Sequence, residues 1–257
     1  MEKNGSLRFA TFLDSDGNTL PKGSLNSYVS QYGLQGKIFR LVFKVVHNGE
    51  LVIRLSQLMV SLFLAITVVL LCALIKKKYN MLMASCFFLV LWLSPWVVNF
   101  ARNLYWVEFT WFIPMVIGLF CSVHIESKKV RIISYFLTFI AILIKCLCGY
   151  EYISTIMMGL ITFLLADLLQ SLISKDKEKA ILIFRTTFII GTFAIIGFLS
   201  AVCMHAQLRG DGNILEGLVT IFKNDVLRRT SGADLNVFAS NLWDSINASK
   251  WEVLCNY

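Results

Sequence analysis

Six long apolar runs constrain the fold of this sequence more than any other feature. Short polar segments separate them, and they cover residues 57–75, 81–99, 106–125, 132–148, 153–173 and 181–204. A helix needs about 20 mostly apolar residues to cross a hydrocarbon core roughly 30 Å thick. The sequence therefore predicts an all-α fold, a polytopic transmembrane helical bundle of about six spans.

The overall composition supports this prediction. Hydrophobic residues make up 57% of the chain and charged residues only 16%, whereas a soluble domain is roughly 45–50% apolar. A soluble fold could not keep so much apolar surface away from water. The formal net charge is +8, but the basic residues lie in short clusters between apolar runs. We therefore expect membrane lipids as partners and no nucleic acid.

Positive charge is distributed unevenly between the short loops. Alternate loops carry the three lysine clusters, which are Lys76–Lys78, Lys128–Arg131 and Lys175–Lys179. Of the other two short loops, one contains Arg102 and the loop at 149–152 has no positive charge. The positive-inside rule places the lysine clusters in the cytoplasm. We expect a multi-pass protein of the inner (cytoplasmic) membrane, with its lysine-rich loops cytoplasmic.

An even number of spans places both chain ends outside. Residues 1–50 then form an outer segment, 51–205 the six-span region and 206–257 a second outer segment. A polar segment of this length is hard to export without a preceding helix, and residues 1–17 have no apolar core typical of a signal peptide. Either the chain is the middle of a longer membrane protein, which we favour, or one span is miscounted.

The two outer segments contain apolar positions near helical spacing. Residues 24–47 and 213–228 both have this pattern, which is typical of short amphipathic helices at the membrane interface. Gly33 and Gly36 interrupt the first segment, so we expect two short helical pieces there.

Cysteine and histidine do not form a recognisable metal motif. The chain has seven cysteines and three histidines, and none of them has the spacing of a zinc site. Cys146 and Cys148 are two residues apart on a predicted helix, so their side chains point in different directions and we expect no disulfide between them.

Ionisable side chains at the outer side of the membrane are candidates for function, because burying such groups is expensive. The candidates are Asp14, Asp16, Arg102, Glu108, Lys145, Glu151, Arg209 and Asp211.

Asp14 and Asp16 alternate with Asn18, a spacing at which oxygen ligands can converge on Mg²⁺ or Ca²⁺. A turn is the favoured interpretation, because Gly17 comes too early for an EF-hand and these residue types favour turns. We therefore expect no cofactor, with a divalent cation at Asp14 and Asp16 as the alternative.

The other candidates have simpler structural explanations. Lys145 lies about one turn from the outer end of its predicted helix, so its ammonium can reach water. Glu151 lies in a tight turn and is expected to be solvated, as is Asp167 at the cytoplasmic end of its helix. Arg102 and Glu108 bracket an aromatic turn, where they could form an ion pair.

Three outer segments together resemble a known class of proteins. They are SYVSQYGLQGKIFRLVFK (27–44), SPWVVNFARNLYWVEFTWFIP (94–114) and CGYEYIS (148–154). In style and order they resemble polytopic membrane proteins of bacterial surface-polysaccharide clusters that are similar to GT-C glycosyltransferases. The resemblance covers about residues 10–160 and includes no diagnostic motif.

The resemblance implies a function. Members take a sugar from a polyprenyl-phosphate-linked donor and transfer it to a glycan acceptor. A catalytic acidic residue lies in their first outer loop, a position that Asp14 or Asp16 matches here. Arg102, Lys145 and Arg209 would meet the donor phosphate, and Glu108 and Glu151 are further substrate-binding candidates. A helix precedes that loop in the family, which agrees with a chain that is part of a longer protein.

Three other functions remain open. An O-antigen-type polymerase has a similar topology and location. A flippase or transporter of lipid-linked glycans would need charged or broken helices near the bilayer midplane, where these runs are apolar. A non-catalytic membrane subunit would need no acidic outer site.

Overall fold

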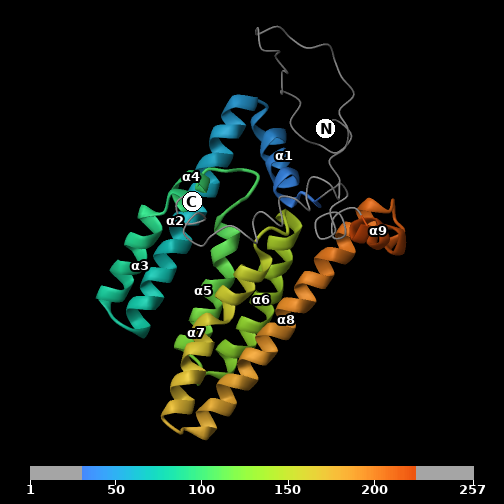
Figure 1. Ribbon diagram of the computed structural model, residues 1–257. Coiled ribbons are helices and arrows are strands. Elements are labelled where there is room, and N and C mark those ends of the chain that lie inside the picture. The colour runs from blue at the N-terminus through green and yellow to red at the C-terminus, as the bar shows by residue number, and fades with distance from the viewer. Residues whose placement is uncertain (1–30, 224–257) are drawn as a thin grey trace, which may run out of the picture. The chain divides into compact units, whose positions relative to one another are not determined.

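The computed structural model describes residues 31–223, and all regular secondary structure in this range is helical (Figure 1). The helices are α1 (Leu34–Val46), α2 (Gly49–Lys78), α3 (Met81–Leu93), α4 (Pro95–Phe100), α5 (Phe109–Val123), α6 (Lys128–Cys148), α7 (Ile153–Ile173), α8 (Lys177–Arg209) and α9 (Ile214–Ile221). The chain divides into two compact units, Met1–Val202 and Cys203–Tyr257, and the boundary falls inside α8.

Four helices are long and apolar enough to cross a membrane. They are α2 with 30 residues, α6 and α7 with 21 residues each, and α8 with 33 residues. The predicted all-α membrane bundle is therefore confirmed.

The other two predicted spans are shorter helices, because local backbone chemistry ends them early. Pro95 occupies the first position of α4, and α3 ends at Leu93 after 13 residues. A helix of this length extends about 20 Å, less than the roughly 30 Å of a hydrocarbon core. The third apolar run begins with a turn, so α5 starts only at Phe109 and has 15 residues.

In the first unit, α5 packs against α2, α6 and α7. Helix α5 lies parallel to α7, because residues that follow one another along α5 contact residues in the same order along α7. At one end the Trp111 and Tyr152 rings are 5.0 Å apart. One turn before its other end, Gly118 lies against the backbone of Leu160. Helix α5 is thus the central element of this unit.

Helix α2 lies along α5 in the same direction. The rings of Phe63 and Phe109 are 5.2 Å apart at one end. At the other end, Lys77 Nζ lies 2.7 Å from Nε2 of His124, which follows α5 directly. The side-chain oxygens of Asn48 and Asn80 accept hydrogen bonds from the first turns of α2 and α3, which satisfies amides that have no partner within the helix.

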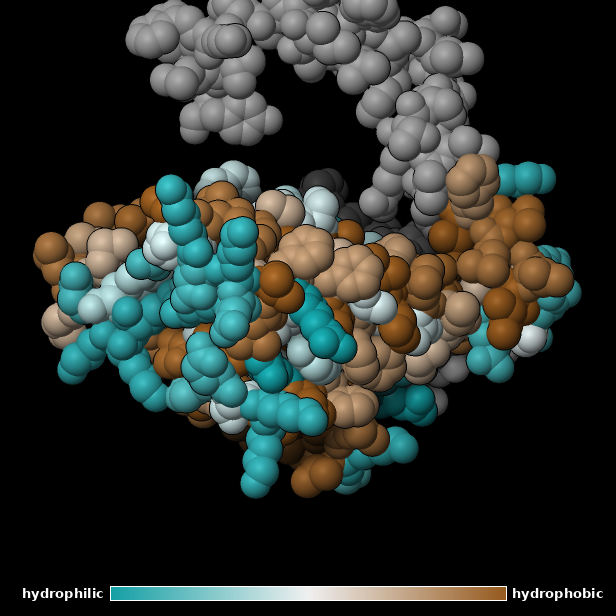
Figure 2. Space-filling view, turned by 90° about the horizontal axis from the view of Figure 1, so that it is seen from below, coloured by the Kyte–Doolittle hydropathy of each residue, from teal (hydrophilic) through white to brown (hydrophobic). Residues whose placement is uncertain are grey.

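The loops α2–α3, α5–α6 and α7–α8 lie at the same end of the first unit (Figure 1). These loops carry the three lysine clusters, and Figure 2 shows hydrophilic side chains gathered on this face. The prediction that the lysine clusters share one side of the bundle is therefore confirmed.

The segment around α1 tests the interruption that was predicted at Gly36. Helix α1 runs without interruption from Leu34 to Val46 and includes Gly36. A single glycine inside a helix costs only about 1 kcal/mol relative to alanine, so Gly36 does not break it. Gly33, with φ 69°, lies just before the helix. Residues 24–30 and 224–228 lie outside the described range. In the described part of the other segment, α9 (Ile214–Ile221) is amphipathic, as predicted.

A prediction follows from the contact between α5 and α7. A Cβ atom at Gly118 would lie 1.7 Å from the backbone oxygen of Leu160, so Gly118→Ala must push the two helices apart. We expect a loss of about 1–3 kcal/mol in the free energy of unfolding, the usual effect of overpacking, measured by denaturant unfolding in detergent micelles.

Gly159→Ala is the matched control, because its Cβ would lie 4.0 Å from Met115, an ordinary contact distance. We expect this variant to be neutral or slightly stabilised, since alanine favours the helix. Equal losses in the two variants would contradict the close approach at Gly118.

Candidate functional site

Two buried glutamines connect α1 to the end of the bundle opposite the lysine clusters. Gln31 Nε2 donates hydrogen bonds to the Tyr105 hydroxyl, at 2.8 Å, and to the Glu151 carboxylate. Gln35 Nε2 donates to the backbone oxygens of Tyr105, at 3.0 Å, and Cys148, at 2.9 Å. These bonds bring together the α1 region, the α4–α5 turn and the end of α6. We use the name polar end cluster for Gln31, Gln35, Tyr105, Lys145 and Glu151.

Lys145 lies inside this cluster. Its side chain is 1% exposed, and Nζ donates to the Gly149 backbone oxygen at 2.6 Å. The Glu151 carboxylate attracts the ammonium electrostatically. The prediction that this ammonium reaches water is wrong, because α1 packs over the end of α6 through the hydrogen bond from Gln35 to Cys148. A buried cation persists in a membrane protein only with such partners.

Glu151 also differs from its prediction as a solvated carboxylate. It is partly buried and accepts the hydrogen bond from Gln31. Gly149 makes room for it, because a Cβ atom there would lie 2.2 Å from Glu151 Oε2 and 3.3 Å from Gln31 Nε2. Gly149 therefore has two roles: it ends α6, as predicted, and it allows the carboxylate to reach the cluster.

Glu108 and Arg102 do not form the ion pair considered from the sequence. Glu108 is 2% exposed, while Arg102 is exposed and makes no salt bridge to it. Burial raises the pKa of the Glu108 carboxyl to about 8, since desolvation disfavours the charged form. At neutral pH the Glu108 carboxyl is therefore mostly uncharged, and an uncharged carboxyl cannot form an ion pair with the Arg102 guanidinium.

Four aromatic side chains pack against one another beside the polar end cluster. The Trp106 ring lies 5.2 Å from Phe100, 5.5 Å from Trp111 and 5.6 Å from Tyr152. The Tyr105 ring, which belongs to the polar end cluster, is 6.1 Å from Trp106. We call Phe100, Trp106, Trp111 and Tyr152 the aromatic cluster. It joins the α4–α5 turn to the starts of α5 and α7.

Two residues at these clusters have a strained backbone. Val107 has φ 46° and Tyr152 has φ 58°, values that residues with a branched or bulky side chain rarely adopt. Strain of this kind costs about 1–3 kcal/mol per residue and is concentrated at functional sites. Both residues lie in the turns that precede α5 and α7, and Lys175 in the α7–α8 loop has a similar value, φ 60°.

Other residues proposed from the sequence lie elsewhere. Asp14 and Asp16, with the alternative cation site, fall outside the described residues. Arg209 is half-buried at the end of α8 and belongs to the second unit. Within residues 31–223, no group of three or more His, Cys, Asp or Glu side chains could hold a metal ion. The six cysteines in this range are free thiols.

Asp167 forms a second polar contact, at the end of the bundle with the lysine clusters. Its carboxylate accepts a hydrogen bond from Ser122 Oγ at 2.5 Å and pairs with Lys78 Nζ at 2.6 Å. The two charged side chains are only 12% and 15% exposed. The prediction of a solvated carboxylate is wrong here, because α2, α5 and α7 converge on it.

Gln31 and Gln35 were not among the residues predicted for the site, because the candidates at this end of the bundle were ionisable groups. Gln35 is the second residue of α1, whereas Gln31 precedes the helix and the left-handed Gly33. The spacing of the two glutamines therefore does not place them on one helix face, and no local pattern in the sequence indicates their hydrogen bonds.

The arrangement combines amide, hydroxyl, carboxylate and ammonium groups with aromatic ring faces. Such a set can bind a polyhydroxylated ligand that has a negatively charged substituent. Comparison with protein-family models, curated proteins and solved structures finds no match for this chain.

The pKa of Glu108 generates a prediction about pH. Between its ordinary value of 4.5 and about 8, the folded protein keeps a proton that the unfolded chain releases. Raising the pH through this range therefore lowers the free energy of unfolding, by up to about 1.4 kcal/mol for each pH unit. We expect Glu108→Gln to remove this contribution, so that the variant exceeds the wild type in thermal stability at pH 8.5 more than at pH 5.

Glu50→Gln serves as the control, because the Glu50 side chain is 76% exposed. Its thermal stability in detergent should follow the wild type across the whole pH range. A Glu108→Gln curve parallel to the wild type would contradict the burial of this carboxyl.

Proposed function

We propose that this protein is an integral membrane enzyme that transfers a sugar from a polyprenyl-phosphate-linked donor to a glycan acceptor. The observation that carries the proposal is the polar end cluster beside the aromatic cluster, at the end of the bundle opposite the lysine clusters. The positive-inside rule assigns the lysine clusters to the cytoplasm. The two clusters then lie at the outer surface of the cytoplasmic membrane, where lipid-linked sugars are used.

The side chains suit a sugar ligand. A sugar ring has hydroxyl groups around its edge and apolar C–H groups on its faces. The side chains of Gln31, Tyr105 and Glu151 supply the donors and acceptors that hydroxyl groups need. Trp106 and Tyr152 supply ring faces in the same region. Apolar walls with a few placed polar groups are typical of small-molecule sites.

In the proposed reaction, the oxygen of an acceptor hydroxyl attacks the anomeric carbon of the donor sugar. The bond from that carbon to the phosphate oxygen breaks, and polyprenyl phosphate leaves. A carboxylate accepts the hydroxyl proton as general base. Asp14 or Asp16 is the base that the family resemblance implies, and Glu151 is the carboxylate in the polar end cluster.

Lys145 fits the leaving phosphate. An ammonium has three N–H donors, and the bond to Gly149 uses one of them. Its charge in a poorly solvated site would stabilise the negative charge that develops on the phosphate oxygen. Arg102, exposed in the α4–α5 turn, can attract the anionic donor from the membrane surface.

The test uses cells in which the chromosomal gene is deleted and a variant is expressed at wild-type level. We expect the variant that removes the base, either Glu151→Gln or Asp14→Asn combined with Asp16→Asn, to lower sugar incorporation at least about tenfold, because general bases contribute roughly 10²–10⁴-fold. The polyprenyl-linked donor should accumulate at the same time. Surface glycan composition and lipid-linked sugar are both measured by mass spectrometry.

Glu50→Gln is the matched control and should retain wild-type incorporation. Unchanged glycan in both carboxylate variants would exclude the enzyme and leave a flippase or a non-catalytic subunit as the alternatives.

A further inference from the structure

A groove lies between α2 and α3 near the end that carries the lysine clusters. Its volume is about 590 Å³, within the range of roughly 300–1,000 Å³ that ligand sites occupy. Its lining includes Val69, Ala73 and Lys76 of α2, and Ser85 and Phe88 of α3.

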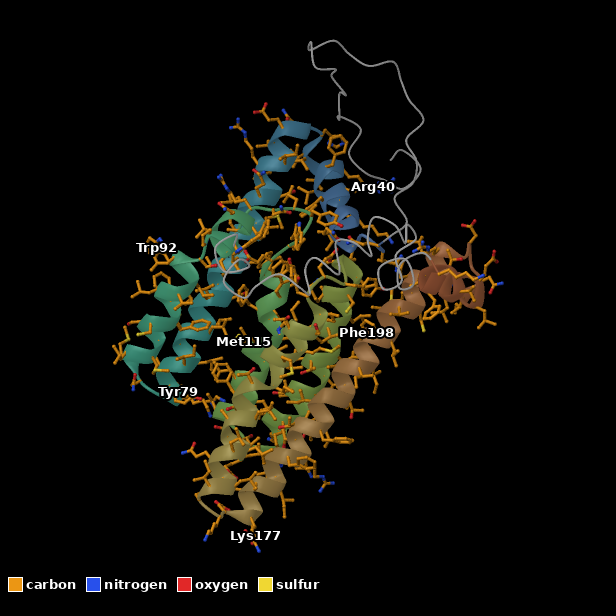
Figure 3. The ribbon with its side chains drawn as sticks, viewed as in Figure 1. Arg40, Tyr79, Trp92, Met115, Lys177 and Phe198 are labelled. Carbon is orange, nitrogen blue, oxygen red and sulfur yellow. The ribbon has the colours of Figure 1, made fainter. Side chains whose placement is uncertain are left out.

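The groove is apolar along its length and has a cation at its end. From Val69 to Lys76 is two turns of α2, about 10 Å. Figure 3 shows α3 beside α2, with Tyr79 at the turn that joins them and Trp92 toward the far end of α3. Lys76 therefore lies near the loop end of the groove, with the apolar lining toward the membrane interior.

Lys76 differs from the two lysines that follow it. Lys77 lies at hydrogen-bonding distance from His124, and Lys78 pairs with Asp167. Within residues 31–223, Lys76 and Ser85 make no side-chain hydrogen bond or ion pair. A cation and a hydroxyl group in the lining are thus available to a ligand.

Helix α3 leaves its apolar surface uncovered by the described part of the chain. Ala84 is its single buried residue. Its exposed large side chains are Met81, Leu82, Met83, Phe88, Leu89, Val90, Trp92 and Leu93. In a membrane bundle such a surface faces lipid. A lipid molecule can therefore enter the groove directly from the bilayer.

We propose that this groove is a binding site for an anionic phospholipid. The lipid phosphate pairs with Lys76, the Ser85 hydroxyl donates to an ester oxygen, and the first part of an acyl chain lies along Val69 and Phe88. Charge selects the lipid, because zwitterionic phospholipids offer no net negative charge to the ammonium. The site lies at the opposite end of the bundle from the polar end cluster, so it does not depend on the proposed function.

Native mass spectrometry of the detergent-purified full chain tests the proposal, with phosphatidylglycerol and phosphatidylcholine of identical acyl chains as probes. We expect saturable binding of phosphatidylglycerol to the wild type. Lys76→Gln should weaken it about fivefold, the effect of removing one lysine near an anionic headgroup. Ala73→Phe should weaken it by filling the groove with a side chain at an exposed position.

Lys177→Gln is the matched control, because Lys177 is an exposed lysine at the same end, away from α2 and α3 (Figure 3). It should bind phosphatidylglycerol like the wild type. Equal binding of the two lipids would overturn the proposal, as would equal losses in the Lys76 and Lys177 variants. A dimer that binds no lipid would assign the groove to a second copy of the chain. If Ala73→Phe does not fold, the comparison of Lys76→Gln with Lys177→Gln tests the proposal by itself.

Discussion

The close approach of α5 and α7 at Gly118 is the contact on which the rest of the first unit depends. Lipid tails are as apolar as leucine side chains, so the hydrophobic effect does not hold membrane helices together. Backbone contact at a small residue supplies the packing instead, and Gly118 allows it against Leu160. The same helix pair contains the Trp111–Tyr152 contact near one end and the Ser122–Asp167 hydrogen bond at the other. The position of Gly118 therefore sets the geometry at both ends of the bundle.

Polar groups inside the helices and polar groups at the helix ends have different hydrogen-bond partners. Several hydroxyls inside the spans bond to the carbonyl four residues earlier in their own helix, as Thr67, Thr162 and Thr186 do. Such bonds satisfy the hydroxyl where no water is present. The buried hydroxyls of Ser56, Ser134 and Thr138 make no such bond. Gln35 and Asp167 make hydrogen bonds to residues distant in sequence, and these two residues lie at opposite ends of the bundle. The spans thus support two chemically different ends.

The long spans could be predicted from the sequence because their signal is local. Helix α7 was predicted at 153–173 and is observed at Ile153–Ile173, since apolar composition alone decides whether a segment lies in lipid. The lengths of the short helices depend on residues that end a helix, and a hydropathy pattern does not detect these residues. Pro95, inside a continuous apolar run, ends α3 early.

The candidate site was predicted only in part, because its geometry depends on contacts distant in sequence. Lys145 and Glu151 were identified as ionisable groups at the end opposite the lysine clusters, but both were expected to be solvated. Their burial depends on the α1 region, and Gln31 precedes its partner Glu151 by 120 residues. The pattern of residues around Gln31, or around Glu151, does not indicate that the two side chains meet.

The central claim is that the polar end cluster and the lysine clusters lie on opposite sides of the membrane, with the polar end cluster outside. Single-cysteine labelling with a membrane-impermeant maleimide tests it most directly, in a background without native cysteines. Arg102→Cys and Lys177→Cys introduce thiols at exposed positions at the two ends. The account predicts that Arg102→Cys is labelled on intact cells and Lys177→Cys only after permeabilisation. Labelling of both positions on intact cells, or of Lys177→Cys alone, would contradict it.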